Sequence, residues 1–175
     1  MAASALRIGA ALFVGVAAIQ PAAAVDNLHF SGSLVASACT LVVNGTNLAE
    51  VNFASLDGSD FIPTGQSMRK PLVFELSDCD SALSGGVRVR FTGTEVSGMN
   101  GILAIDSSSA ASGIGIGIET QMGALVGIND ESGATFTLVT GNNALQLNAW
   151  VQRITGTDLG PGTFSATATV TFEYL

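Results

Sequence analysis

Basic side chains and histidine are scarce in this 175-residue sequence. Six lysines and arginines face fourteen aspartates and glutamates, which gives a formal net charge of −8 at pH 7. Because nucleic acid and anionic membrane surfaces attract cationic proteins, this balance argues against both as partners. His29 is the only histidine, so acyl-transfer chemistry has no obvious general base. We therefore expect no enzyme, no cofactor and no small-molecule substrate.

Long apolar runs are absent beyond the first 24 residues. There, Arg7 precedes an apolar stretch from Ile8 to Ile19, and residues 22–24 are alanines suited to cleavage. The stretch is too short for a comfortable membrane span. We predict that residues 1–24 are a signal peptide and that the mature chain is exported.

Cysteine is limited to Cys39 and Cys79. Two cysteines at this spacing, with one histidine elsewhere, cannot make a tetrahedral metal site. In an exported chain the oxidising compartment favours a disulfide between them. We therefore predict one disulfide and no metal.

Helix formers are also scarce, whereas threonine, valine, isoleucine, serine and glycine are abundant. Glycine-containing turn signals occur at Asn44-Gly45, Asp57-Gly58, Asn100-Gly101 and Pro161-Gly162. Between them, apolar and polar residues alternate as in half-buried strands. This pattern predicts an all-β sandwich of seven or eight short strands, with candidate strands at 28–34, 72–76, 87–91, 101–105, 113–120, 144–152 and 164–174.

The strongest alternation lies at the C-terminal end. Every second residue from Phe164 is apolar, and the residues between them are polar. A strand of about 12 residues would span roughly 40 Å, which is long for a globular protein. The sequence thus places its best strand last, with no partner strand after it.

Three local features leave alternatives open or need a choice. The repeat Gly113, Gly115, Gly117 alternates with isoleucine and lacks the lysine of a phosphate loop, so it indicates a strand with a flat face. Trp150 falls on the polar side of its strand, where it is either a surface contact residue or is turned inward by a bulge. Asn44-Gly45-Thr46 matches a glycosylation sequon, but we favour an ordinary turn.

Both ends of the mature chain resemble the subunits of chaperone-usher pili, the P-pilus and type 1 pilin family. The resemblance rests on residues 25–34, which read VDNLHFSGSL, on Ala38-Cys39-Thr40 and Leu76-Ser77-Asp78-Cys79, and on the terminal strand with its penultimate Tyr174. The family also has a glycine fourteen residues from the end, where this chain has Gly162. The N-terminal segment looks most like that of minor tip-fibre subunits, which suggests a minor or adaptor subunit.

This resemblance implies an incomplete immunoglobulin-like β-sandwich that lacks its seventh strand, G. It divides the chain into a signal peptide (1–24), an N-terminal extension that acts as a donor strand (25–36) and a pilin domain (37–175). The donor residues would be Leu28, Phe30, Gly32 and Leu34. The strand facing the missing neighbour would carry Gly162, Phe164, Ala166, Ala168, Val170, Phe172, Tyr174 and Leu175.

The same resemblance implies partners and a location. A periplasmic pilus chaperone would lend the missing strand, an outer-membrane usher would handle export, and neighbouring pilus subunits would then supply the strand by donor-strand exchange. The chain would end in a cell-surface pilus of a Gram-negative bacterium and support adhesion. The alternative is a self-contained exported β-sandwich that binds a glycan, in which the first and last strands pair within one molecule.

Overall fold

A computed structural model describes residues 38–42, 49–82 and 85–175 of the chain. The chain divides into two units, 1–34 and 35–175, and only the second contains described residues. The predicted signal peptide and donor strand therefore lie outside the described residues. In the part that is described, no helix is long and apolar enough to cross a membrane.

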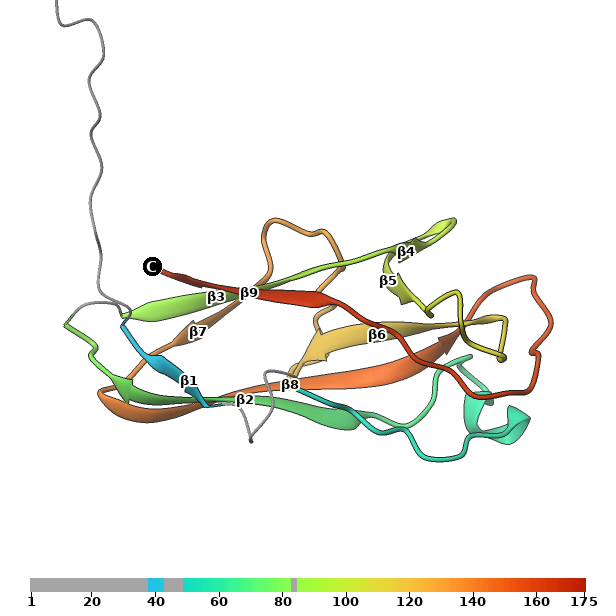
Figure 1. Ribbon diagram of the computed structural model, residues 1–175, viewed down its shortest axis with the longest axis horizontal. Coiled ribbons are helices and arrows are strands. Elements are labelled where there is room, and N and C mark those ends of the chain that lie inside the picture. Colours follow the sequence, from blue (N-terminus) through green and yellow to red (C-terminus); the bar gives the residue numbers. More distant parts are fainter. Residues whose placement is uncertain (1–37, 43–48, 83–84) are drawn as a thin grey trace, which may run out of the picture. The chain divides into compact units, whose positions relative to one another are not determined.

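The described residues form two antiparallel sheets, and the prediction of an all-β sandwich is confirmed (Figure 1). The larger sheet has the strand order β1-β2-β8-β6-β5-β4, and the smaller one has the order β7-β3-β9. In chain order the elements are β1 (Thr40–Val42), η1 (Gly58–Phe61), β2 (Lys70–Cys79), β3 (Gly86–Thr92), β4 (Glu95–Val96), β5 (Met99–Ala104), β6 (Ile114–Thr120), β7 (Ala134–Thr137), β8 (Gly141–Arg153) and β9 (Thr169–Tyr174). The short strands β4 and β7 escaped the sequence analysis because neither is long enough to show a clear alternation.

Period-two alternation places the core between the two sheets. On β8 the side chains of Leu145, Leu147, Ala149 and Val151 are at most 3% exposed, as their spacing predicts. On β3 of the other sheet, Val87 and Val89 are fully buried. Each sheet thus contributes one apolar face to a single core, the arrangement expected for an immunoglobulin-like sandwich.

One turn prediction is wrong. Asn100-Gly101 lies within β5, and the chain reverses instead at Ser97-Gly98, between β4 and β5. Gly98 has φ 78°, a conformation that glycine adopts without strain. Gly101 also has φ 80°, and its Cα packs so close to Gly127 that an added Cβ would lie 3.1 Å from the Gly127 Cα. The glycine signal at this position marks a close approach of two backbones, which a dipeptide pattern cannot distinguish from a turn.

The glycine repeat of β6 explains the position of Trp150. Gly117 lies directly opposite Trp150 in the ladder between β6 and β8, and Trp150 is only 4% exposed. The indole fills the space that a side chain at Gly117 would occupy. The Arg69 guanidinium lies over the indole, 4.7 Å from the ring centroid, in a cation–π contact. The ladder shows no register shift here, so a flat glycine face buries Trp150 and no bulge is needed.

Gly117→Ala is expected to destabilise the subunit by about 1–3 kcal/mol, because the new methyl group would overlap the Trp150 ring and force it to move. Urea unfolding followed by the fluorescence of this single tryptophan measures the effect. Gly58→Ala is the matched control, since a Cβ there meets no atom within 4 Å. Equal unfolding midpoints for the two variants would contradict the packing described here.

Candidate functional site

The C-terminal strand is shorter than its alternation predicts. β9 covers Thr169–Tyr174 and pairs with β3, where the ladder ends at Thr92↔Thr169. Residues 164–168 are not part of a ladder, because beyond Thr92 the chain leaves β3 and enters β4 of the other sheet. The alternation still holds: the even-numbered side chains of 164–174 face the core, and the odd-numbered ones are more exposed up to Thr171.

The core-facing side chains of this segment are only half-buried. We call them the open row: Phe164, Ala166, Ala168, Val170, Phe172 and Tyr174, each packed against the core but none fully covered. On the neighbouring strand β3, by contrast, Val87, Val89 and Phe91 are at most 4% exposed. A strand that lies at the edge of a sheet and also keeps its apolar face half-uncovered lacks a neighbour on that side.

The opposite sheet is similarly uncovered along the same side of the sandwich. β1 is the edge strand of the larger sheet, and Leu41 lies directly opposite the buried Leu76 in its ladder with β2. Residues paired in this way share a face of the sheet, yet Leu41 is 39% exposed whereas Leu76 is 1% exposed. The two sheet edges therefore share the same missing neighbour.

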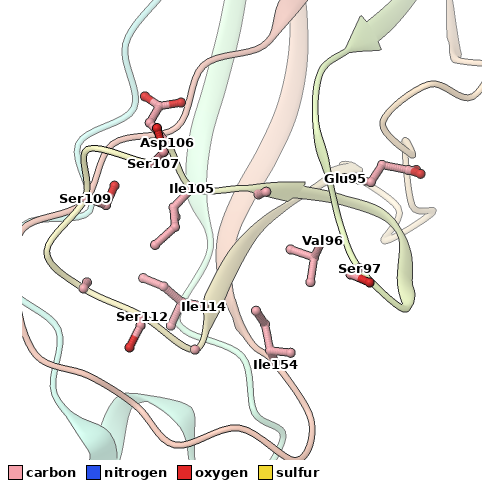
Figure 2. Close-up of a pocket in the computed structure, with 13 residues that line it drawn as sticks. Glu95, Val96, Ser97, Ile105, Asp106, Ser107, Ser109, Ser112, Ile114 and Ile154 are labelled. Atoms are coloured by element: carbon pink, nitrogen blue, oxygen red, sulfur yellow. The ribbon is translucent and has the colours of Figure 1, made fainter.

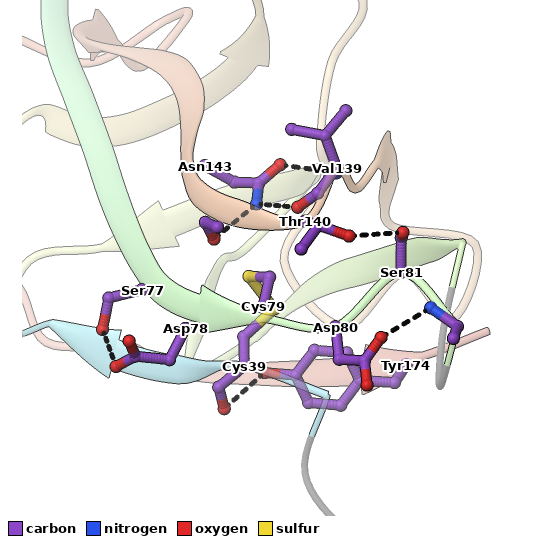
Figure 3. The surroundings of a disulfide bond; sticks show 12 residues. Cys39, Ser77, Asp78, Cys79, Asp80, Ser81, Val139, Thr140, Asn143 and Tyr174 are labelled. Atoms are coloured by element: carbon purple, nitrogen blue, oxygen red, sulfur yellow. Dashed lines mark hydrogen bonds between the residues drawn. A yellow bond between two sulfur atoms is a disulfide. The ribbon is translucent and has the colours of Figure 1, made fainter.

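Two contacts mark the ends of the open row. At one end the ring of Phe164 lies 6.3 Å from that of Phe53, which follows β1 in the chain. At the other end the Tyr174 hydroxyl donates a hydrogen bond of 3.3 Å to the carbonyl oxygen of Cys39, just before β1 (Figure 3). The open row thus runs along the gap between the two sheet edges. Phe53 was missed by the sequence analysis, although its alternation with Val51 is a usable signal.

The backbone of this side is also unpaired. Within the described residues, the N–H and C=O groups of 164, 166 and 168 have no backbone partner. The backbone groups of the odd-numbered residues point the other way: the Leu175 N–H donates to the carbonyl of Gly86 at the start of β3, and the carbonyl of Ser165 accepts from the Asp106 N–H. Since successive residues of an extended chain direct their backbone groups to opposite edges, the even-numbered groups point toward the gap. An added strand would find free donors and acceptors there.

The predicted disulfide between Cys39 and Cys79 is confirmed (Figure 3). It joins the residue before β1 to the last residue of β2, and Asp80 N–H also donates to the carbonyl of Ala38 at 2.8 Å. The bond fixes one end of the β1 edge, where Tyr174 reaches it from β9.

Ion pairs connect the outward face of β9 to β3. Glu173 lies opposite Arg88 and accepts a hydrogen bond of 3.1 Å from it, while Arg90 lies 3.5 Å away and also pairs with Glu131. The two arginines are thus partly exposed, as expected for an outward face, but they also tie β9 to β3. Exposed pairs of this kind contribute less than about 1 kcal/mol each.

Gly162 does not belong to the open row. It is exposed, with φ 154°, and a Cβ there would lie 2.6 Å from the carbonyl carbon of Ala110. The adjacent Thr163 carbonyl accepts hydrogen bonds from the N–H groups of Ala110 and Ala111. Glycine at this position permits the chain to cross the 105–112 loop before it enters the open row.

The 105–112 loop also borders a hollow of about 360 Å³ (Figure 2). Its centre is apolar, formed by Val96, Ile105, Ile114 and Ile154, and its rim carries serines. Among the described residues, two carboxyl groups have a clearly lowered pKa, and both lie elsewhere, in exposed turns: hydrogen bonds from Ser59 lower the pKa of Asp57, and those from Ser132 lower the pKa of Asp130. Local turn geometry explains both shifts.

Comparisons with known proteins agree with this architecture. The family model for the fimbrial protein matches residues 28–175. The chain is 48% identical over 153 residues to an uncharacterized fimbrial-like protein, YfcP, of Escherichia coli K12, covering 87% of this chain and 86% of that protein. It is 33% identical over 180 residues to the type-1 fimbrial protein C chain of Escherichia coli, covering 97% and 96% of the two chains.

Solved structures show the same fold. The P pilus rod subunit PapA shares 26% sequence identity and a TM-score of 0.68, over 79% of this chain and 100% of that one. A structure of a chaperone-usher pilus gives 26% identity and a TM-score of 0.67, over 90% and 100%. Because the family model and both relatives cover most of its length, this chain belongs to the fimbrial protein family and is a structural subunit of a bacterial surface pilus.

Proposed function

We propose that the open row and the unpaired edge beside it form an acceptor groove, which a strand from another pilus subunit fills by donor-strand exchange. The observation that carries this proposal is the half-burial of the six side chains of the open row beside a fully buried neighbouring strand. An uncovered apolar face next to free backbone groups is unfavourable in water and prone to aggregation. A donated strand removes both problems at once, through ladder hydrogen bonds and apolar burial.

The donated strand is the N-terminal extension, residues 25–36, of the next subunit. Leu28, Phe30 and Leu34 are spaced to face one side of a paired strand, and Gly32 interrupts the series. The acceptor side has a matching unevenness, since Ala166 and Ala168 are small and lie between Phe164 and the larger residues that follow. Such a surface favours one register of the inserted strand over its neighbours.

Before assembly, a periplasmic pilus chaperone occupies the groove, and an outer-membrane usher exports the subunit. Tyr174 and Leu175 belong to the proposed acceptor edge, so we expect the chaperone's strand to lie beside them as well. Cleavage of residues 1–24 and transit through the periplasm precede both steps. A minor or adaptor place in the fibre stays a prediction, which the ratio of this subunit to others in purified pili would test.

The alternative, a self-contained glycan-binding sandwich, requires pairing of the first and last strands within one molecule. In the described part of the chain β9 pairs only with β3, and β1 pairs only with β2. The first predicted strand, 28–34, lies outside the described residues, and the pilus mechanism is favoured instead by the half-covered open row, from which a self-contained domain gains nothing.

Peptides of residues 25–36 test the donor strand directly. If Gly32 faces the floor of the groove, Gly32→Leu in the peptide should weaken binding about ten- to a hundred-fold through overpacking. Exchange of the peptide into the chaperone-bound subunit, followed on native gels, measures this effect. Ser31→Leu is the matched control, because residue 31 would face outward in a strand that directs Gly32 into the groove, and a leucine there should be tolerated. Equal exchange by the unmodified and Gly32→Leu peptides would overturn the proposed role of the arm.

A further inference from the structure

The two halves of the open row are held in different ways. The second half belongs to β9, whose ladder with β3 extends from Val87↔Tyr174 to Thr92↔Thr169. The first half, residues 164–168, has no ladder partner among the described residues. It nevertheless keeps Phe164, Ala166 and Ala168 against the core. Something other than a sheet holds this half in place.

The 105–112 loop supplies the missing contacts. The Asp106 N–H donates to the Ser165 carbonyl at 2.7 Å, and the Asp106 carboxylate accepts from the Ser165 hydroxyl at 2.9 Å and from the Thr167 hydroxyl at 3.2 Å. The Ser109 hydroxyl lies 3.1 Å from the Ser165 N–H and 3.2 Å from the Ser165 carbonyl oxygen. One carboxylate thus binds two successive outward side chains of the first half.

The loop is anchored on its other side. Ile105 points toward the centre of the hollow near Ile114 and Ile154, whereas Asp106 points away from it (Figure 2). The Ala110 and Ala111 N–H groups hold the Thr163 carbonyl at 2.9 and 3.1 Å. The loop therefore packs Ile105 against apolar side chains on one side (Figure 2) and binds the first half of the open row on the other. Its position sets that of residues 163–167.

We infer that Asp106 is a positioning residue for the acceptor groove, holding residues 163–167 extended so that the groove reaches from Phe53 to Cys39 instead of ending at β9. This inference rests on the proposed function. Its physical basis is that hydrogen bonds to an ionised carboxylate are stronger than neutral ones and here replace a ladder. Without the Asp106 carboxylate the first half keeps its backbone contacts to the loop but loses both hydrogen bonds from its outward side chains, so it leaves the core more often and binds an inserted strand less tightly.

The test compares Asp106→Ala with Ser107→Ala, a neighbouring exposed residue of the same loop, and with Asp106→Asn, which keeps an acceptor oxygen. Affinity for the peptide of residues 25–36 should fall about ten-fold in Asp106→Ala, recover only in part in Asp106→Asn, whose amide oxygen accepts weaker hydrogen bonds, and remain unchanged in Ser107→Ala. Amide hydrogen exchange gives the second readout. The amides of residues 110, 111 and 165 should exchange about ten-fold faster in Asp106→Ala, while those of 169–174 stay unchanged.

The possible outcomes distinguish the inferred role of Asp106 from the proposed function of the acceptor groove. If Asp106→Ala binds the peptide as tightly as the unmodified subunit, the inference is overturned and the acceptor groove stands. Equally faster exchange over 163–168 and 169–174 also overturns it, because Asp106 would then act on overall stability. If the unmodified subunit does not bind the peptide at all, the proposed function itself fails, and the inference with it.

Discussion

Deletion of residues 25–33 is expected to remove the subunit from all internal positions of the fibre. If each subunit has one acceptor groove and one donor arm, as proposed, a copy without the arm accepts a neighbour's strand but cannot donate its own. Such a copy can occupy only one end of a fibre. In bacteria that carry only the deleted form, the amount of this subunit in sheared pili, measured against its amount in the periplasm, should fall to a small fraction of the normal ratio.

The matched control keeps the arm at full length and changes its chemistry. Replacing Leu28, Phe30 and Leu34 together by serine should reproduce the deletion, since the arm is expected to act through apolar burial in the groove. The same variant should still bind an added peptide of residues 25–36, because its groove is unchanged. Normal incorporation of the deleted form along the fibre would refute donor-strand exchange for this subunit.

Loss of the disulfide should have the second large effect. Replacing Cys39 and Cys79 by serine opens a covalent loop with a sequence separation of 40, and on the chain-entropy account the folded subunit loses about 4 kcal/mol. The structural consequence falls on the groove, because the carbonyl of Cys39 accepts the hydrogen bond from Tyr174. Urea unfolding of the chaperone-free subunit and the yield of chaperone-bound subunit both measure the loss.

Two observations check that result. Mass measurement under non-reducing conditions should show that both thiols of the unmodified periplasmic subunit are bonded. The Tyr174→Phe variant serves as control, because it removes the hydrogen bond to Cys39 while the disulfide remains, and such a bond contributes only about 0.5–1.5 kcal/mol. An unfolding midpoint of the double serine variant equal to that of the unmodified subunit would contradict the expected role of the disulfide.

The amino-acid sequence by itself determined most of the longer strands and which of their faces lie in the core. Alternation in β2, β3 and β8 is strong because each strand has one face in the core, and such a pattern depends only on residue order. The disulfide was also predictable, since an exported chain with two cysteines has one possible pairing. The open row could be predicted as a set of residues, because its alternation extends from Phe164 to Tyr174.

Only the tertiary structure decided how that row is held and why it stays uncovered. Local sequence does not reveal that β3 ends at Thr92, so the length of β9 could not be predicted from its own alternation. The same holds for Asp106 and Phe53, which reach the open row from distant parts of the chain. Trp150 is buried because Gly117 lies opposite it, a fact of register between two strands. Contacts between residues far apart in sequence depend on how the strands pair, and strand pairing is not a local property of the chain.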